Sequence, residues 1–262
     1  MKVIFQILLC TLLVNLLACS NSRVQQGGEP KEKTVSQQDN IIRLTEEEKD
    51  QSWELLFDGK STDAWRGYNK DSFPVYGWSV KNGILGCSYK GADSKKLGKD
   101  IITKEQFENF ELELEFLMGD SSNSGIFYLV QELDKPIYFS APEYQLLDNK
   151  AFIFSDEDLK KHHKHLSGDN YALEGPLKDY TNEKGEWNKA KLKIVDKHVE
   201  HWLNGHKTAD YVLGSEKWRS QVSQSKFSKW KEYGMATKGH IGLQDHGLEH
   251  EAWFRNIKIR KL

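Results

Sequence analysis

Short runs of alternating apolar and polar residues cover most of the chain, and this period of two is typical of β-strands. The clearest run, residues 110–116, places Glu111, Glu113 and Glu115 on one face and apolar residues on the other. We expect a half-exposed strand with a solvated acidic face there. Similar runs predict strands at 53–57, 77–80, 83–88, 125–130, 143–147, 190–195, 198–203, 239–247 and 254–259.

Turn and helix signals divide these runs. The Asn-Gly pairs at 82–83 and 204–205 favour tight hairpin turns. A capping-box pattern at 45–48 predicts a short helix over 49–52. Further helices are predicted at 159–165, capped by 155–158, and at 218–233, with a break at 223–227.

Many strands, hairpin turns and few helices indicate an all-β fold of two antiparallel sheets packed face to face. A jelly-roll sandwich fits best, because its curved sheet offers one concave face to a ligand. We expect a single domain over 45–262, about 220 residues long. The 8 Trp, 10 Tyr and 12 Phe of the whole chain would mostly fill the core, and some would be free to stack on sugar rings.

The N-terminus has the pattern of a secretory signal, with Lys2, an apolar stretch at 3–17 and Leu-Leu-Ala before Cys19. Its end resembles a bacterial lipobox, which predicts a signal peptide over 1–18 and lipidation of Cys19. A plain signal peptide or membrane anchor is the alternative. Residues 19–44 would hold the lipidated cysteine and a flexible linker. We therefore expect a lipid-anchored protein of the cell envelope, on the periplasmic or surface face of the outer membrane.

Charge and cysteine content narrow the function classes. A formal net charge of −2 provides no electrostatic argument for a nucleic-acid partner, so none is expected. Cys10 and Cys19 belong to the signal and the anchor, which leaves Cys87 without an internal disulfide partner. Cys87 lies in the predicted 83–88 strand, where a lone cysteine is more often a small buried apolar group than a nucleophile.

The segments 239–247 and 254–259 carry an unusual concentration of polar residues. We interpret them as two strands of one sheet, with Ile241, Leu243, Ile257 and Ile259 facing the core. The polar residues between and beside these positions are His240, Gln244, Asp245, His246 and Arg255. Together with the segments 123–126 and 143–149, they predict a polar cleft on a β-scaffold, suited to a hydroxyl-rich ligand.

Eight short motifs occur in one order along the chain. They are Leu56-Phe-Asp-Gly-Lys60 with Trp65, Trp78-Ser-Val-Lys-Asn-Gly83, Asn123-Ser-Gly-Ile126, Tyr144-Gln-Leu-Leu-Asp-Asn149, Gly185-Glu-Trp-Asn188, Leu203-Asn-Gly205, 239–246 and Phe254-Arg-Asn-Ile257. In this order they resemble the 3-keto-disaccharide hydrolase domain family, which is frequent among lipoproteins of gut Bacteroidetes, over 53–262. The resemblance implies a concanavalin A-like jelly roll and an enzyme that cleaves oxidised, 3-keto glycosides.

A ketone at C3 changes what glycoside cleavage requires. It acidifies the proton on C2, so a base can remove that proton and the group at C1 can leave by β-elimination, with or without later addition of water. The usual pair of carboxylates at a fixed separation is then not obligatory. The site needs a general base near C2, a donor or metal for the enolate oxygen, and an acid for the leaving oxygen.

The strand at 143–147 carries the candidate base. Glu143 and Gln145 are two apart and face the same way, into the cleft if Tyr144 and Leu146 face the core. Glu143 is therefore the candidate general base or metal ligand, and Gln145 a candidate for binding sugar hydroxyls. An outward-facing glutamate is the alternative. Asp148 at the strand end is either a further substrate contact or only part of a turn.

Four more residues complete the candidate site. Asn123 and Gln244 are candidate substrate contacts, with turn capping as the alternative for Asn123. His246 is expected on the same face as Gln244, and is the candidate acid or enolate-stabilising donor because imidazole titrates near neutral pH. A structural role is its alternative. Arg255 would clamp a carboxylate-bearing or polyhydroxyl ligand, or pair with a glutamate of the 110–116 strand.

No cofactor follows from the sequence, and the question of a divalent metal stays open. His162, His163 and His165 lack the spacing that grips one zinc ion on a helix, and lysines surround them. We expect a solvated helix face there. A metal held by Glu143, His246 and their neighbours is an alternative. The alternative function is a non-catalytic carbohydrate-binding envelope lipoprotein on the same fold.

Overall fold

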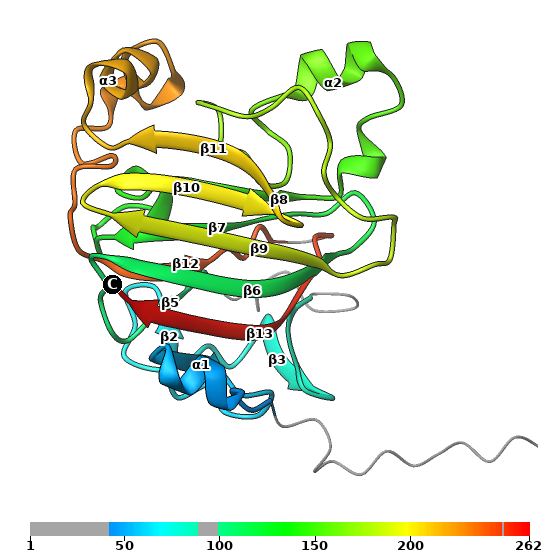
Figure 1. Cartoon of the computed structure of the whole chain (residues 1–262), viewed down its shortest axis with the longest axis vertical. Coiled ribbons are helices and arrows are strands. Elements are labelled where there is room, and N and C mark those ends of the chain that lie inside the picture. Colours follow the sequence, from blue (N-terminus) through cyan, green and yellow to red (C-terminus); the bar gives the residue numbers. More distant parts are fainter. Residues whose placement is uncertain (1–41, 89–98, 248) are drawn as a thin grey trace, which may run out of the picture. The chain divides into compact units, whose positions relative to one another are not determined.

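The alternating runs pair into two antiparallel sheets in the part of the chain that the structure describes, residues 42–88, 99–247 and 249–262 of a computed structural model. The sheets pack face to face, and the eight-stranded sheet lies in front of the five-stranded sheet in Figure 1. This arrangement confirms the predicted all-β sandwich. The N-terminal predictions over 1–41, including lipidation of Cys19, lie outside the described residues.

The eight-stranded sheet has the order β11-β10-β9-β6-β13-β4-β3, with β1 also paired to β13. Its strands are β1 (Trp53–Phe57), β3 (Trp78–Lys81), β4 (Ile84–Cys87), β6 (Phe110–Met118), β9 (Asn188–Val195), β10 (His198–Leu203), β11 (His206–Val212) and β13 (Ala252–Lys261). The expected Asn-Gly turns connect β3 to β4 and β10 to β11, and all four of their residues have positive φ angles.

The five-stranded sheet has the order β2-β5-β12-β7-β8, so β8 is one of its edges. Its strands are β2 (Trp65–Gly67), β5 (Ile101–Thr103), β7 (Asn123–Val130), β8 (Glu143–Leu147) and β12 (His240–Leu243). Between the sheets lies the hydrophobic core, to which each sheet contributes alternate residues, such as Ile126 and Tyr144 from one and Leu112 and Ile257 from the other.

The helices lie where capping residues predict them, with shifted ends. They are α1 (Glu46–Asp50), α2 (Asp156–His162) and α3 (Glu216–Ser223), with 3₁₀ turns η3 (Ile137–Phe139), η4 (Asn149–Ala151) and η5 (Lys226–Lys229). Both hydrogen bonds of the α1 capping box form. The break predicted at 223–227 within the 218–233 segment is confirmed, since α3 ends at Ser223 and the chain continues as the 3₁₀ turn η5.

The face of β6 that carries glutamates is not the solvated acidic face expected from its sequence. The antiparallel register sets each glutamate opposite basic residues of the neighbouring strands. Ion pairs join Glu111 to Arg260 at 2.5 Å, Glu113 to Lys189 at 2.9 Å and Glu115 to Arg255 at 2.6 Å. The outer face of the eight-stranded sheet is therefore a charge-paired surface rather than an acidic one.

The two polar segments near the C-terminus belong to different sheets, which corrects the interpretation that they share one. β12 pairs with β5 and β7, whereas β13 pairs with β1, β4 and β6. Both strands still bury their alternate apolar residues, because the two sheets share one core. Cys87 is buried in that core, and burial raises the pKa of its thiol well above the usual range. None of the helices in the described residues is long and apolar enough to cross a membrane.

Candidate active site

The alternation of β8 directs Glu143 and Gln145 away from the core. Tyr144 and Leu146 are fully buried between the sheets, and the Tyr144 hydroxyl donates to the carbonyl oxygen of Trp202 at 3.0 Å. Glu143 and Gln145 therefore lie on the opposite face of the five-stranded sheet, the face turned away from the eight-stranded sheet. Their side chains are still buried, at 7% and 2% exposure, because segments outside the sheet cover them.

Gly125 of β7 makes room for the Glu143 carboxyl group. The register pairs Gly125 with Gln145 and Phe127 with Glu143. A Cβ atom at Gly125 would lie 2.3 Å from Oε1 of Glu143 and 2.9 Å from its Cδ. The carboxyl group thus lies directly across the glycine backbone, which is the close approach that a glycine inside a strand often marks.

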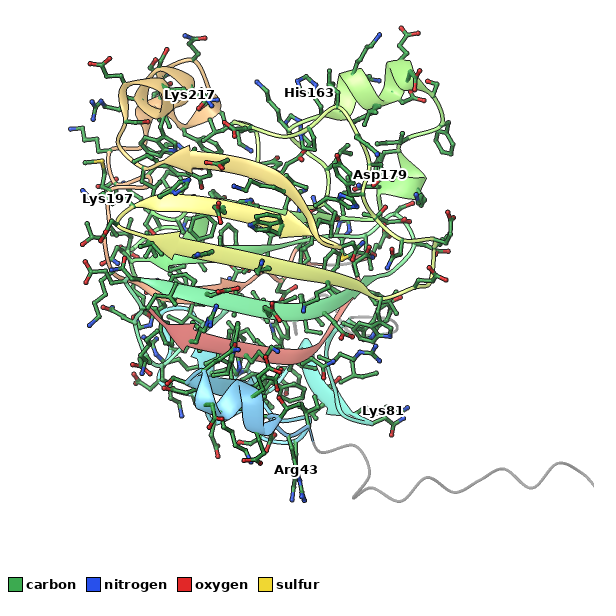
Figure 2. All side chains as sticks on the ribbon, viewed as in Figure 1. Arg43, Lys81, His163, Asp179, Lys197 and Lys217 are labelled. Carbon is green, nitrogen blue, oxygen red and sulfur yellow. The ribbon has the colours of Figure 1, made fainter. Side chains whose placement is uncertain are left out.

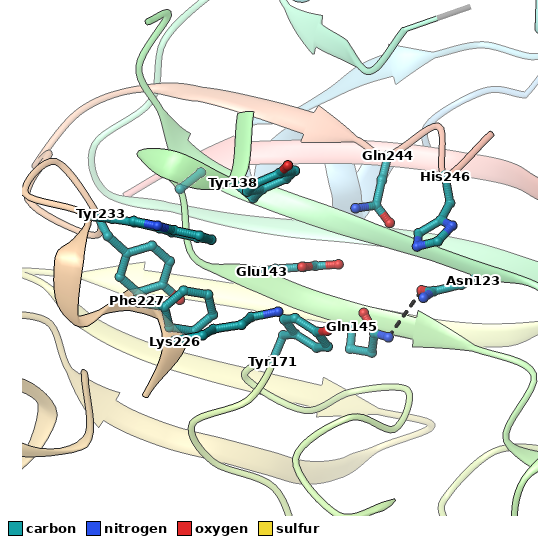
Figure 3. Close-up of a pocket in the computed structure, with 12 residues that line it drawn as sticks. Asn123, Tyr138, Glu143, Gln145, Tyr171, Lys226, Phe227, Tyr233, Gln244 and His246 are labelled. Carbon is teal, nitrogen blue, oxygen red and sulfur yellow. Dashed lines mark hydrogen bonds between the residues drawn. The ribbon is translucent and has the colours of Figure 1, made fainter. Parts of the chain in front are cut away.

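A cavity of about 330 Å³ covers this face of the sheet. Its polar lining residues are Asn123, Glu143, Gln145, Lys226, Gln244 and His246. Figure 3 shows the Glu143 carboxyl group in the middle, with the two glutamines and His246 around it. Glu143 and His246, distant in sequence, thus contribute to the wall of one cavity.

Aromatic side chains form the rest of the wall together with Ala141, and sequence reasoning did not assign them to the site. They are Tyr138, Tyr171, Phe227, Trp230 and Tyr233. Phe227 and Tyr233 stack with ring centroids 4.1 Å apart, and the N–H of Gly234 donates to the carbonyl oxygen of Ser140 at 2.9 Å. This bond ties the segment after α3 to the segment after η3. Aromatic faces of this kind stack on the apolar faces of sugar rings.

Glu143 carries an unpaired carboxyl group. No side-chain hydrogen bond or ion pair holds it among the described residues. Burial raises its pKa from 4.5 to about 8, a rise that the nearby Lys226 ammonium opposes and the Asp100 carboxylate favours. A group with a pKa near the working pH can both accept and return a proton.

Lys226 supplies a positive charge to the same cavity. Its ammonium group lies 4.0 Å from the ring centroid of Tyr171 and 5.3 Å from that of Phe227. It forms no ion pair with any residue that the structure describes. A cation held by aromatic faces, and not neutralised by a carboxylate, remains available to an oxyanion of a ligand.

Two amide side chains point unused acceptors into the cavity. The Gln145 amide nitrogen donates to Oδ1 of Asn123 at 3.1 Å, the bond drawn in Figure 3. The Oε1 atoms of Gln145 and Gln244 are buried and have no hydrogen-bond partner among the described residues. Buried acceptors without partners are costly, so these two oxygens fit a ligand that brings hydroxyl donors.

His246 lies at the open side of the cavity. Its ring contacts that of His250 edge to face at 4.4 Å, and Nδ1 of His250 accepts the backbone N–H of Asn123 at 3.1 Å. Partial loss of hydration and the neighbouring His250 both lower the pKa of His246. The imidazole is therefore neutral at pH 7, and can donate a hydrogen bond from one nitrogen and accept one at the other.

Asp148 and Arg255, both predicted substrate contacts, lie outside this cavity. β8 ends at Leu147, and the Asp148 carboxylate then accepts the backbone N–H of Ser121 at 2.9 Å, so the turn interpretation applies. Arg255 is on the outer face of the other sheet, where it pairs with Glu115 and lies over the Trp187 ring. Its alternative role, pairing with a β6 glutamate, is the one observed.

Metal-ligand geometry does not single out the cavity. A metal site needs several His, Cys, Asp or Glu side chains whose ligand atoms lie close together. Within the described residues one group of three has these atoms within 4.8 Å of one another, namely His198, Glu200 and Asp210. Lys207 forms ion pairs with both carboxylates of that group, so a cation already occupies it. The histidines at 162–165 are at the end of α2, and Figure 2 shows His163 in this outer part of the fold.

Comparisons with known proteins agree with the motifs. A family model for the 3-keto-alpha-glucoside-1,2-lyase-like domain matches residues 52–260. A 3-keto-disaccharide hydrolase of Bacteroides thetaiotaomicron is 33% identical over 294 aligned positions, which span the whole of both chains.

Two crystal structures from Parabacteroides distasonis, each described as a "putative glycosyl hydrolase", share the fold. One is 34% identical with a TM-score of 0.73 and covers 85% of this chain and 99% of its own. The other is 26% identical with a TM-score of 0.59 and covers 80% and 99%. The chain belongs to the 3-keto-alpha-glucoside-1,2-lyase-like domain family.

Proposed function

We propose that this protein is an enzyme that cleaves glycosides whose sugar carries a ketone at C3, with Glu143 as the general base. Family membership and the 3-keto-disaccharide hydrolase relative support the substrate class. The observation that carries the proposal is the unpaired Glu143 carboxyl group, with a pKa of about 8, in a cavity that offers unused acceptors and aromatic faces. That combination suits proton transfer at a carbon of a bound sugar.

The proposed reaction begins at C2. The Glu143 carboxylate takes the C2 proton, and the electron pair of the C–H bond moves toward C3 to form an enolate on the ketone oxygen. The enolate then returns its electrons to form a C1–C2 double bond and expel the oxygen at C1, which takes up the proton that Glu143 now carries. Addition of water across that double bond gives the hydrolysis product, so lyase and hydrolase outcomes share the first steps.

The other cavity residues have roles in the same steps. Lys226 has no ion-pair partner among the described residues, and its charge lowers the pKa of Glu143. Its ammonium group would stabilise the negative charge of the enolate oxygen. His246 would donate a hydrogen bond to the leaving oxygen from the open side of the cavity. Gln145, Gln244 and Asn123 would bind ring hydroxyls, which orients C2 toward the base.

The test is turnover of 3-keto-glucosides and their unoxidised parents in heavy water. We expect release only from the oxidised substrates, with deuterium at C2 of a hydrolysis product and no hydrogen left at C2 of an elimination product. Glu143→Gln should abolish both, whereas Glu108→Gln, at an exposed glutamate, should not. Release from neither substrate, with glycan affinity retained in Glu143→Gln and in His246→Ala, would replace this proposal with a non-catalytic carbohydrate-binding protein.

We also propose that the enzyme is lipid-anchored through Cys19 in the cell envelope, at the outer membrane. The motivation is the Leu-Leu-Ala-Cys sequence after a short apolar stretch. The wild type should partition into the detergent phase in Triton X-114, and a Cys19→Ala variant into the aqueous phase. Equal partition of both proteins would refute lipidation at this residue.

A further inference from the structure

A second cavity adjoins the first, and His246 belongs to the walls of both. It measures about 570 Å³. The two cavities also share the η3 segment, since Tyr138 lines the first and Ile137, one residue earlier, lines the second. His246 and η3 therefore form the boundary between two spaces, each within the roughly 300–1,000 Å³ typical of ligand pockets.

The chemistry of the second cavity differs from that of the first. Its polar lining side chains are Asn69, Lys70, Lys99, Asp100, Asp134, Lys135, Asp245 and His246, and they lie beside the apolar Pro136 and Ile137. Tyr68 is the one Phe, Tyr or Trp among the described lining residues, and backbone groups hold its hydroxyl, which accepts the N–H of Leu133 and donates to the carbonyl oxygen of Lys135, both at 3.0 Å. Stacking therefore contributes little here, and hydrogen bonding dominates.

Charge in this cavity is nearly balanced. Three lysines, Lys70, Lys99 and Lys135, line it together with three aspartates, and Lys135 also pairs with Glu232 at 3.8 Å. Asp100 accepts the backbone N–H of Asp245 at 2.8 Å, and burial raises the pKa of Asp100 to about 7, so its carboxyl group can donate or accept near neutral pH. Mixed donors and acceptors without a strong net charge suit a neutral, hydroxyl-rich group better than an anion or an aromatic ring.

We propose that this second cavity binds the leaving group, and that the leaving group is a hydroxyl-rich, non-aromatic unit such as a second sugar ring. The proposal rests on the proposed function. It adds the position of the cleaved bond. The 3-keto ring occupies the cavity of Glu143, and the bond between the two units passes His246. The position of His246 on the shared wall thus places the single N–H group of its neutral imidazole beside the oxygen that departs.

A double variant tests the subsite. Lys70 and Lys99 are exposed lysines of the second cavity and belong to neither the base nor the aromatic wall. For Lys70→Ala with Lys99→Ala we expect kcat/KM to fall about tenfold with a 3-keto disaccharide, the loss of about two hydrogen bonds. With methyl or p-nitrophenyl 3-keto-glucoside, whose leaving groups carry no hydroxyls, kcat/KM should change less than twofold.

The matched control is Lys81→Ala with Lys197→Ala, two exposed lysines labelled in Figure 2 that do not line either cavity. It should behave as wild type with all three substrates. An equal change for all three substrates in the Lys70 and Lys99 variant would overturn the subsite and leave the proposed function intact. A wild type inactive on methyl 3-keto-glucoside and on the disaccharide would overturn both.

Discussion

Replacing Glu143 by glutamine should stabilise the fold, and more so at alkaline pH. Burial raises the pKa of Glu143 from 4.5 to about 8. In the unfolded chain the carboxyl group therefore ionises from pH 4.5 upward, whereas in the folded protein it keeps its proton to about pH 8. Between these two pH values the folded state binds more protons than the unfolded chain. The free energy of unfolding is therefore highest below pH 4.5 and falls as pH rises to about 8.

The size of the effect follows from the width of the window. Each pH unit between 4.5 and about 8 costs about 1.4 kcal/mol, so the wild type loses about 5 kcal/mol through this one group. Glutamine cannot ionise and loses nothing. Any fixed difference between the two side chains, such as an unsatisfied amide, is the same at every pH and cancels when two pH values are compared.

Urea unfolding of both proteins at pH 5.0 and pH 8.5 measures the effect. The stability advantage of Glu143→Gln should grow by about 4 kcal/mol between these pH values. Asp169, whose pKa burial also raises, has no electrostatic coupling to Glu143, so it titrates alike in both proteins and cancels. Glu108→Gln serves as the exposed control. Growth of less than about 1 kcal/mol would show that Glu143 ionises normally in the fold, and would remove the basis for its assignment as a base.

Four shorter predictions follow from other contacts. Gly125→Ala should lower kcat at least tenfold with the fold retained by circular dichroism, because its Cβ would clash with Glu143; full activity would contradict the close approach. Lys226→Met should move the rising limb of the kcat/KM pH profile upward, because the ammonium lowers the pKa of Glu143; an unmoved limb would remove Lys226 from the electrostatics. Arg255→Ala should keep kcat/KM within about twofold and cost at most about 1 kcal/mol in urea unfolding; a tenfold activity loss would place Arg255 in the site after all. Cys87 should react with a thiol reagent only after unfolding, and rapid labelling of the native protein would show it accessible.

The fold was predictable where local pattern determines it. The predicted strands at 53–57, 143–147 and 198–203 have the bounds observed for β1, β8 and β10. Sheet membership was not predictable from alternation, since both sheets bury their apolar residues in the same core. β12 and β13 are close in sequence, yet the chain passes from one sheet to the other between Leu243 and Ala252.

The site was predictable only in the part that strands provide. Strand parity identified the face of Glu143 and Gln145. Gln244 and His246 line the same cavity as expected, but from the segment after β12, which ends at Leu243 and not within the predicted 239–247 strand. The residues missed, Lys226 among them, come from irregular segments before β8, after it and after α3, whose folding over the sheet depends on long-range contacts. Their only local signal was a basic residue among closely spaced aromatics, which core packing explains equally well.

The distribution of energetic costs points to one face of the five-stranded sheet, the face that carries Glu143. Strand interiors disfavour glycine by about 0.5–1 kcal/mol relative to alanine, yet β7 and β12 carry Gly125 and Gly242 there, and a Cβ at either would clash with Glu143 or with Ile137 of η3. On that face too lie the unpaired carboxyl group and the partnerless oxygens of Gln145 and Gln244, as far as the described residues show. A sandwich stabilised by its buried core can tolerate such costs, but nothing in packing requires them to gather in one cavity. Their concentration is what a site kept ready for a polar ligand would produce, since natural proteins depart from local rules mainly where function requires it.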